Sequence, residues 1–108
     1  MNLEEKILAT LSPIVPAISP NKYAGDSDEY IVFSYNERSA LNADDDEQET
    51  SHSVRVDYVL PHGINPNDKN RRIKQALKSI SETSIDITNA SEDMFHHYVF
   101  DFSMLREN

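Results

Sequence analysis

The chain has no cysteine and only two glycines among its 108 residues. Without cysteine, disulfides, thiolate zinc sites and thiol nucleophiles are excluded. A loop that binds nucleotide phosphates needs several glycines close together, whereas Gly25 and Gly63 lie far apart in the chain. The sequence therefore predicts neither a P-loop nor a dinucleotide-binding fingerprint.

Basic residues are also scarce. Ten lysines and arginines stand against nineteen aspartates and glutamates, which gives a formal net charge of −9. Proteins that hold nucleic acid through phosphate contacts carry the opposite sign on their binding surface. We therefore expect no specific nucleic-acid binding.

The chain lacks a long apolar run. Residues 7–21 form the longest uncharged stretch, and three prolines interrupt it. This stretch is shorter than the roughly 20 residues that cross a bilayer as a helix. Glu4 and Glu5 also stand where a secretory signal has basic residues. We expect a soluble, intracellular protein without membrane contact.

Two segments have the apolar spacing of amphipathic helices. The stripe of the first, in residues 3–12, consists of Leu3, Ile7, Leu8 and Leu11. The stripe of the second consists of Ile73, Ala76, Leu77 and Ile80. We expect Pro13 to end the first helix. We expect the second to begin with Asn65 as its cap, Pro66 in its first turn and Asp68 completing a variant of the capping box.

The remaining apolar residues predict strands. Residues 29–35 are rich in β-branched and aromatic side chains and favour a central strand, while the proline-rich connector 13–22 allows only an extended or edge segment. A period of two predicts a half-buried strand over 53–60, with one apolar face made of Val54, Val56, Tyr58 and Leu60. Ile85 and Ile87 mark a short strand.

The last predicted strand, about residues 95–105, has an aromatic face made of Tyr98, Phe100, Phe102 and Met104. We interpret this face as core, because the basic surroundings of an RNA-stacking platform are missing. The order of elements predicts an α+β fold in one domain, residues 1–108. Its mainly antiparallel sheet has the two helices packed on one face.

Residues 39–52 form a predicted exposed loop with dense negative charge. Five carboxylates occupy six consecutive positions: Asp44, Asp45, Asp46, Glu47 and Glu49. They repel one another and cannot pack into a core. A calcium loop would alternate ligands with spacers and turn on a glycine, and no glycine follows until Gly63. We favour charge complementarity to a partner over a metal site.

The outer face of the second helix has the opposite charge. Half of all basic residues lie within ten positions: Lys69, Arg71, Arg72, Lys74 and Lys78. This basic face can be a solvated helix surface, can meet the acidic loop of its own chain, or can meet the loop of an identical neighbour in a ring. We favour the ring, in which the acidic loop and the basic face are partner-binding sites on separate elements.

Catalytic motifs find little support. The four histidines are His52, His62, His96 and His97. Neighbours in a strand point to opposite faces, so His96 and His97 cannot share one metal ion. We expect one histidine to be half-buried and the others to lie on the surface. No nucleophile-elbow motif accompanies the serines. We predict no enzymatic activity and no cofactor.

Several strings, in their order and spacing, resemble the tail completion, or tail terminator, proteins of long-tailed bacteriophages and prophages. They are Tyr30-Ile31-Val32-Phe33, Ala43-Asp44-Asp45, Val54-Arg55-Val56-Asp57 and Tyr98-Val99-Phe100-Asp101-Phe102, and the resemblance covers about residues 3–104. Two positions depart from the pattern of the family. Glu29 stands where a proline often precedes the first strong strand, and Ser84-Ile85 stands where Gly-Phe often follows the second helix.

The resemblance implies a structural subunit without catalytic residues. Such a subunit forms a homo-oligomeric ring, of six copies, that joins the phage tail tube to the head connector. It is found in the host cytoplasm during assembly and then in the virion tail. The loop 39–52 is the part expected to reach partners or the lumen. A strongly acidic ring would repel phosphates, so DNA could pass through without binding. The alternative is a small adaptor or regulatory domain that binds a basic protein through the acidic loop.

Overall fold

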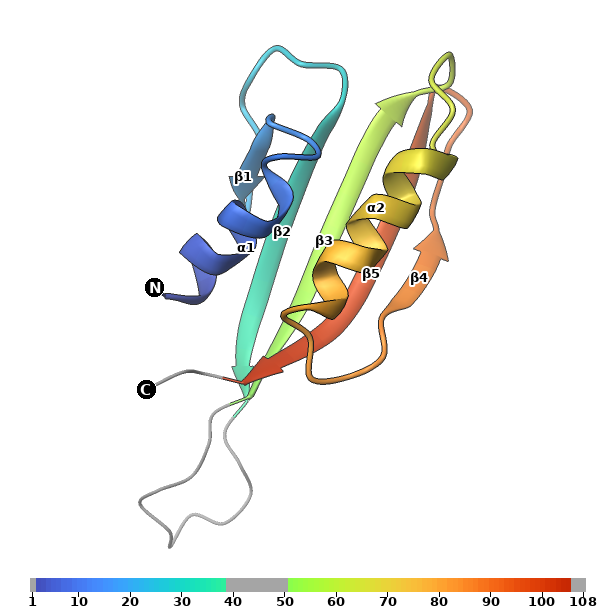
Figure 1. Cartoon of the computed structure of the whole chain (residues 1–108). Helices are drawn as coiled ribbons and strands as arrows, with labels where there is room; N and C mark the ends of the chain where they lie inside the picture. Colours follow the sequence, from blue (N-terminus) through green and yellow to red (C-terminus); the bar gives the residue numbers. More distant parts are fainter. Residues whose placement is uncertain (1, 39–50, 106–108) are drawn as a thin grey trace, which may run out of the picture.

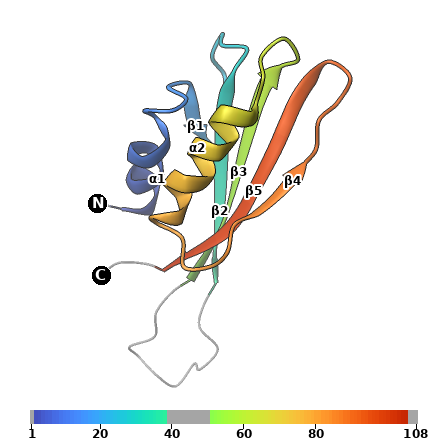
Figure 2. The same ribbon diagram turned by 45° about the vertical axis from the view of Figure 1, so that its right-hand side comes forward.

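The computed structural model describes residues 2–38 and 51–105. In chain order the elements are α1 (Leu3–Leu11), β1 (Ile18–Pro20), β2 (Tyr30–Arg38), β3 (Ser51–Pro61), α2 (Asn67–Lys78), β4 (Asp86–Asn89) and β5 (Phe95–Leu105). The strands form a sheet in the order β1-β2-β3-β5-β4, and neighbours are antiparallel except β1 and β2. Both helices lie against the same face of the sheet (Figure 1, Figure 2). The predicted α+β class is therefore confirmed.

The first helix begins and ends close to where the sequence predicts. Asn2 Oδ1 accepts the backbone N–H of Glu5 at 2.7 Å, and the Glu5 carboxylate accepts the N–H of Asn2 at 3.3 Å. This reciprocal capping box satisfies two helix-terminal donors that would otherwise have no partner. Ile7 and Leu11 are fully buried, so the predicted stripe faces the core.

The proline-rich connector supplies an edge strand, as expected. β1 is three residues long and pairs with one neighbour, β2. Its parallel direction could not be predicted, because it depends on the turn that follows. That turn contains Asn21 at a φ of 63°, a left-handed conformation that asparagine tolerates better than most residues.

The core lies between the helices and the inner face of the sheet. Alternate residues of β3 and β5 point into it, and they include Val54, Val56, Tyr58, Leu60, Phe100, Phe102 and Met104. From α2, Ile73 and Leu77 are fully buried and Ala76 packs on the core, as does Ile80, two residues beyond the end of the helix. The predicted apolar faces are confirmed, including the interpretation of the aromatic face as core.

The predicted start of the second helix is wrong in detail. The helix begins at Asn67 with Pro66 as its cap residue and has no capping side chain. Asn65 Oδ1 accepts the N–H of Asn67 at 2.9 Å, which makes a turn ahead of the helix, and Asp68 pairs with Arg71. The fixed φ of proline already suits the helix, so Pro66 takes the position predicted for Asn65.

The predicted short strand around Ile85 and Ile87 exists, with bounds shifted to β4. It lies at the edge of the sheet opposite β1, and all four of its residues are exposed. Ile85 packs on the core, whereas the Ile87 side chain keeps 43% of its surface exposed. This strand therefore forms one rim of the molecule.

Candidate interaction surfaces

Residues 39–50 of the predicted acidic loop lie outside the described residues. Binding of a partner by Asp44, Asp45, Asp46, Glu47 and Glu49 therefore stays a prediction. The predicted end of the loop at residue 52 is wrong, because β3 already begins at Ser51. His52 is only 8% exposed and lies edge-on to the ring of Tyr35, with centroids 5.9 Å apart. His52 lies on the face of β3 that points toward the core, and it is paired with both neighbouring strands. The strand therefore extends through this residue.

The predicted basic face of α2 holds four of its five members. Arg72, Lys74 and Lys78 are exposed and form no ion pair with any residue that the structure describes. Arg71 is exposed too, but its guanidinium lies 2.8 Å from Asp68 Oδ1, on the same helix. Three lysine and arginine side chains thus remain available to a partner.

Lys69 does not belong to this outer face, which corrects the sequence interpretation. It precedes the buried Ile73 by four residues, so it lies on the inward side of the helix. Its Nζ is 2.7 Å from Glu29 Oε1, and both side chains are largely shielded from solvent. Lys69 ties the helix to the start of β2 rather than facing another molecule.

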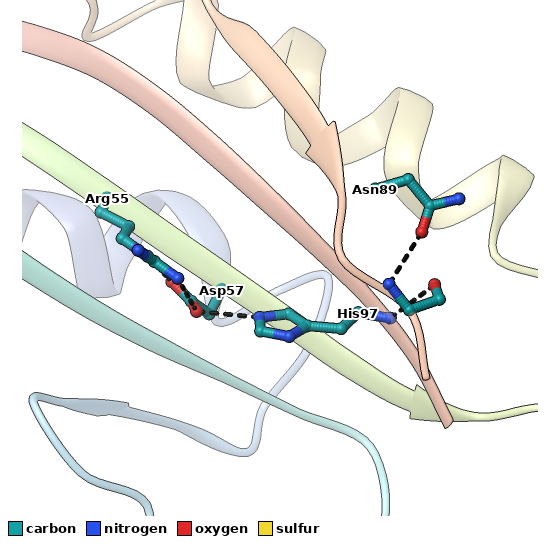
Figure 3. A network of polar contacts seen from close by, with 5 residues as sticks. Arg55, Asp57, Asn89 and His97 are labelled. Atoms are coloured by element: carbon teal, nitrogen blue, oxygen red, sulfur yellow. Dashed lines mark hydrogen bonds and ion pairs between the residues drawn. The ribbon is translucent and has the colours of Figure 1, made fainter. Parts of the chain in front are cut away.

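The face of the sheet opposite the helices carries a polar cluster of Arg55, Asp57 and His97 (Figure 3). Arg55 donates to both Asp57 oxygens, at 2.8 and 3.1 Å. His97 Nε2 lies 2.8 Å from Asp57 Oδ2 on the neighbouring strand. Burial tends to raise the pKa of Asp57, but the hydrogen bonds and charges of Arg55 and His97 outweigh it, so the pKa is lowered. The carboxylate is therefore held in its charged form.

Two further hydrogen bonds hold the backbone beside this cluster. Ser91 Oγ accepts the N–H of His97 at 2.9 Å, and Asn89 Oδ1 accepts the N–H of Ser91 at 2.9 Å (Figure 3). These contacts fix the turn between β4 and β5 against the start of β5. They explain how the cluster keeps its geometry on a face that the helices do not cover.

An acidic groove lies beside the cluster on the same face. Asp86 of β4 and Asp101 of β5 are directly opposite each other in the strand register. Both line a groove together with Ser53, Thr83, Ser84, Phe102 and Ser103. Like charges directly opposite in a sheet repel. Neither carboxylate forms a close ion pair within the described ranges 2–38 and 51–105, although Arg55, directly opposite Asp101 in the register of β3 and β5, attracts it electrostatically.

Sequence reasoning missed this groove, although a signal was present. Residues 79–105 contain five acidic residues and no lysine or arginine. The run at residues 44–49 is much denser in acidic residues and is the stronger local signal. The pairing of Asp86 with Asp101 additionally depends on the β4–β5 register, which no local pattern predicts.

A second groove lies at the other end of the open face. Its apolar lining consists of Tyr30, Val59, Pro61, Phe95 and Met94, whose side chain is 83% exposed, and its polar lining consists of Ser27 and Asp28. Tyr23 stacks on Tyr30 with ring centroids 4.6 Å apart. The open face therefore has an acidic end and an end where aromatic and apolar side chains lie beside Ser27 and Asp28.

The histidines differ from the expectation. Only His62 is exposed; His52 is buried, and His96 and His97 are half-buried because β5 is an inner strand. The ring of His96 packs on His62, at 4.3 Å between centroids, while His97 binds Asp57. In the described part of the chain, no three histidine or carboxylate side chains are grouped as metal ligands. The two described helices are also not of the length and apolarity needed to span a membrane.

No protein-family model and no curated protein sequence matches the chain. Among the solved structures with a similar fold, two match over nearly the whole length of both chains. One carries only a sequence identifier as its name; its TM-score is 0.67 at 11% identity, with 97% of this chain and 90% of that chain covered. The other belongs to the virion of a native gene transfer agent particle, with a TM-score of 0.64 at 9% identity and 99% and 96% covered. At such identities the likeness shows a shared α+β fold.

Proposed function

We propose that this chain is a structural subunit of a phage-like virion. More specifically, it is a tail completion subunit that forms a ring, of six copies, between the tail tube and the head connector. The observation that carries the proposal is the fold shared with a chain of the gene transfer agent virion, across 99% of this chain and 96% of that one. The residues of β2, β3 and β5 that resemble the tail completion family support the same assignment.

The surfaces fit a subunit that assembles. One face of the sheet is left open by both helices (Figure 2). Basic side chains of α2 and acidic side chains of the open face lie on different elements, so identical copies can complement one another. The polar clusters at Asp57 and Glu29 consist of mutually paired side chains, so the proposal assigns the protein no catalytic step and no cofactor.

The net charge suits a ring through which DNA moves. Each copy contributes −9, so the ring has the same sign as the DNA backbone. Repulsion then favours sliding of DNA over binding. In this proposal DNA passes through the ring without binding to it, and the binding partners are proteins.

Deletion of the coding region from the encoding phage or prophage tests the proposal. We expect filled heads and separate tails, seen by electron microscopy, and few infectious particles. Purified protein added to the extract should restore joined particles. A variant with Ile73→Asp, which places a charge in the core, is the matched control and should not restore them. Normal particles in the deletion strain would contradict the proposal.

A further inference from the structure

Two surfaces of unlike charge lie on opposite sides of the sheet. The basic side chains Arg72, Lys74 and Lys78 face outward from α2, on the helix-covered side. The groove lined by Asp86 and Asp101 opens on the other side. Because the sheet separates them, the two surfaces cannot meet within one copy of the chain.

We infer that the outer face of α2 from one copy docks in the Asp86–Asp101 groove of the next copy. The place of this contact in a virion ring rests on the proposed function, but the contact itself is a property of the purified chain. The occupant is therefore a second copy of this protein, and the chemistry that recognises it is a pair of ammonium or guanidinium groups meeting two carboxylates.

Spacing supports the match. Lys74 and Lys78 are four residues apart on a helix, so they lie side by side about one turn, roughly 5–6 Å, apart. Directly opposite residues of antiparallel strands, such as Asp86 and Asp101, are separated by a similar distance, about 4.5–5.5 Å between Cα atoms. The two spacings are therefore similar enough for each cation to meet one carboxylate.

The groove gains from such an occupant. Alone, the two carboxylates repel each other across the register. Arg55, opposite Asp101, relieves this repulsion only in part, because its guanidinium is already paired with both oxygens of Asp57. A cation inserted from another copy adds attraction to both carboxylates. The hydroxyl oxygens of Ser53, Thr83 and Ser84, which line the same groove, can accept further hydrogen bonds from the N–H groups of lysine or arginine.

The contact is heterologous, because each copy offers the helix on one side and the groove on the other. Each copy added through such a contact leaves one helix and one groove free, so the assembly grows until it closes into a ring or continues as a filament. Docking α2 against the open face would also cover part of the surface that the helices of the same copy leave bare.

Cross-linking between copies tests the contact directly, since the natural chain has no cysteine. Gln75→Cys on α2 and Ser84→Cys in the groove, which keep every charge of the two surfaces, are made in separate chains, mixed at high concentration and low salt, and treated with a short bis-thiol cross-linker. We expect several-fold more mixed dimer than with the control pair Gln75→Cys and Asp26→Cys, where Asp26 lies in an exposed turn. The excess of mixed dimer over the control should fall in about 0.5 M salt, because salt screens the attraction between exposed charges. Equal yields from the two pairs overturn the inference.

Charge exchange supplies the second arm. The double variant Lys74→Glu and Lys78→Glu should weaken self-association at least tenfold by sedimentation, with an unchanged circular dichroism spectrum. Mixing it with the variant Asp86→Lys and Asp101→Lys should restore a complex. Self-association that persists in the glutamate variant, or a strictly monomeric natural chain, overturns the contact. Normal head–tail joining without the protein overturns the proposed function instead, so the two failures are distinguishable.

Discussion

Lys69 Nζ lies 2.7 Å from Glu29 Oε1, and the other carboxylate oxygen of Glu29 accepts the hydroxyl of the fully buried Tyr58. One carboxylate therefore links the first turn of α2, the residue before β2 and the middle of β3. The three groups are 40 and 29 positions apart in the chain. Burial, with the hydrogen bond and charge of Glu29, raises the pKa of Tyr58, so the phenol stays a donor at all ordinary pH values.

Loss of this ammonium group should destabilise the fold. Lys69→Met keeps the aliphatic length but leaves Glu29 without its ion pair, so we expect a cost of about 1 kcal/mol, between an exposed pair and a hydrogen bond to a fully buried charge. Lys74→Met, on the exposed face of the same helix, is the matched control and should change the free energy of unfolding by less than about 0.5 kcal/mol. Urea denaturation measures both. Equal effects of the two variants would show that the contact with Glu29 contributes nothing.

The same carboxylate predicts how stability depends on pH. Burial tends to raise the pKa of Glu29, but the hydrogen bonds from Lys69 and Tyr58 and the charge of Lys69 outweigh it, so the folded-state pKa lies below the ordinary 4.5. Between these two values the unfolded chain binds more protons than the folded chain, so stability rises with pH. The contribution of Glu29 is complete above the unfolded-state value and is lost as the pH falls through the folded-state value.

Urea midpoints from pH 6 down to pH 3 measure this dependence. Glu29→Gln should flatten the part of the curve below about pH 5, because a titrating carboxylate has been removed. Asp57, whose pKa is also lowered, remains in that variant and should keep part of the slope. If Glu29→Gln left the whole slope unchanged, the assignment of the lowered pKa to Glu29 would be wrong.

Asp57 and Asp101 on the open face should contribute unequally to stability. Asp57→Asn removes the charge that Arg55 and His97 share, so we expect a loss of about 1 kcal/mol of unfolding free energy. Asp101→Asn removes repulsion with Asp86 and also the attraction of Arg55, which is directly opposite, so the two effects offset each other and the loss should be smaller than for Asp57→Asn. Thermal unfolding of the two purified variants makes the comparison. A larger loss from Asp101→Asn than from Asp57→Asn would contradict this description of the face.

Much of the architecture follows from local patterns in the sequence. The stripes of the two helices, the alternating face of β3 and the aromatic face of β5 all lie where their periodicity predicts. These signals are readable because burial acts on every third or fourth residue of a helix and every second residue of a strand, whatever the neighbours are.

Contacts between distant segments could not be read in the same way. In the sequence, nothing distinguishes Lys69 from the other basic residues of its helix, or Glu29 from other acidic residues. Their ion pair follows only from the packing of α2 over the start of β2. The Asp86–Asp101 pair likewise exists only through the register of β4 with β5. Residue types and spacing determined which segments are helices and strands. Contacts between charges 15 to 40 residues apart depend instead on how those segments pack. The physical reason is that a shift of one residue in the register of a strand would turn each of its side chains to the other face of the sheet.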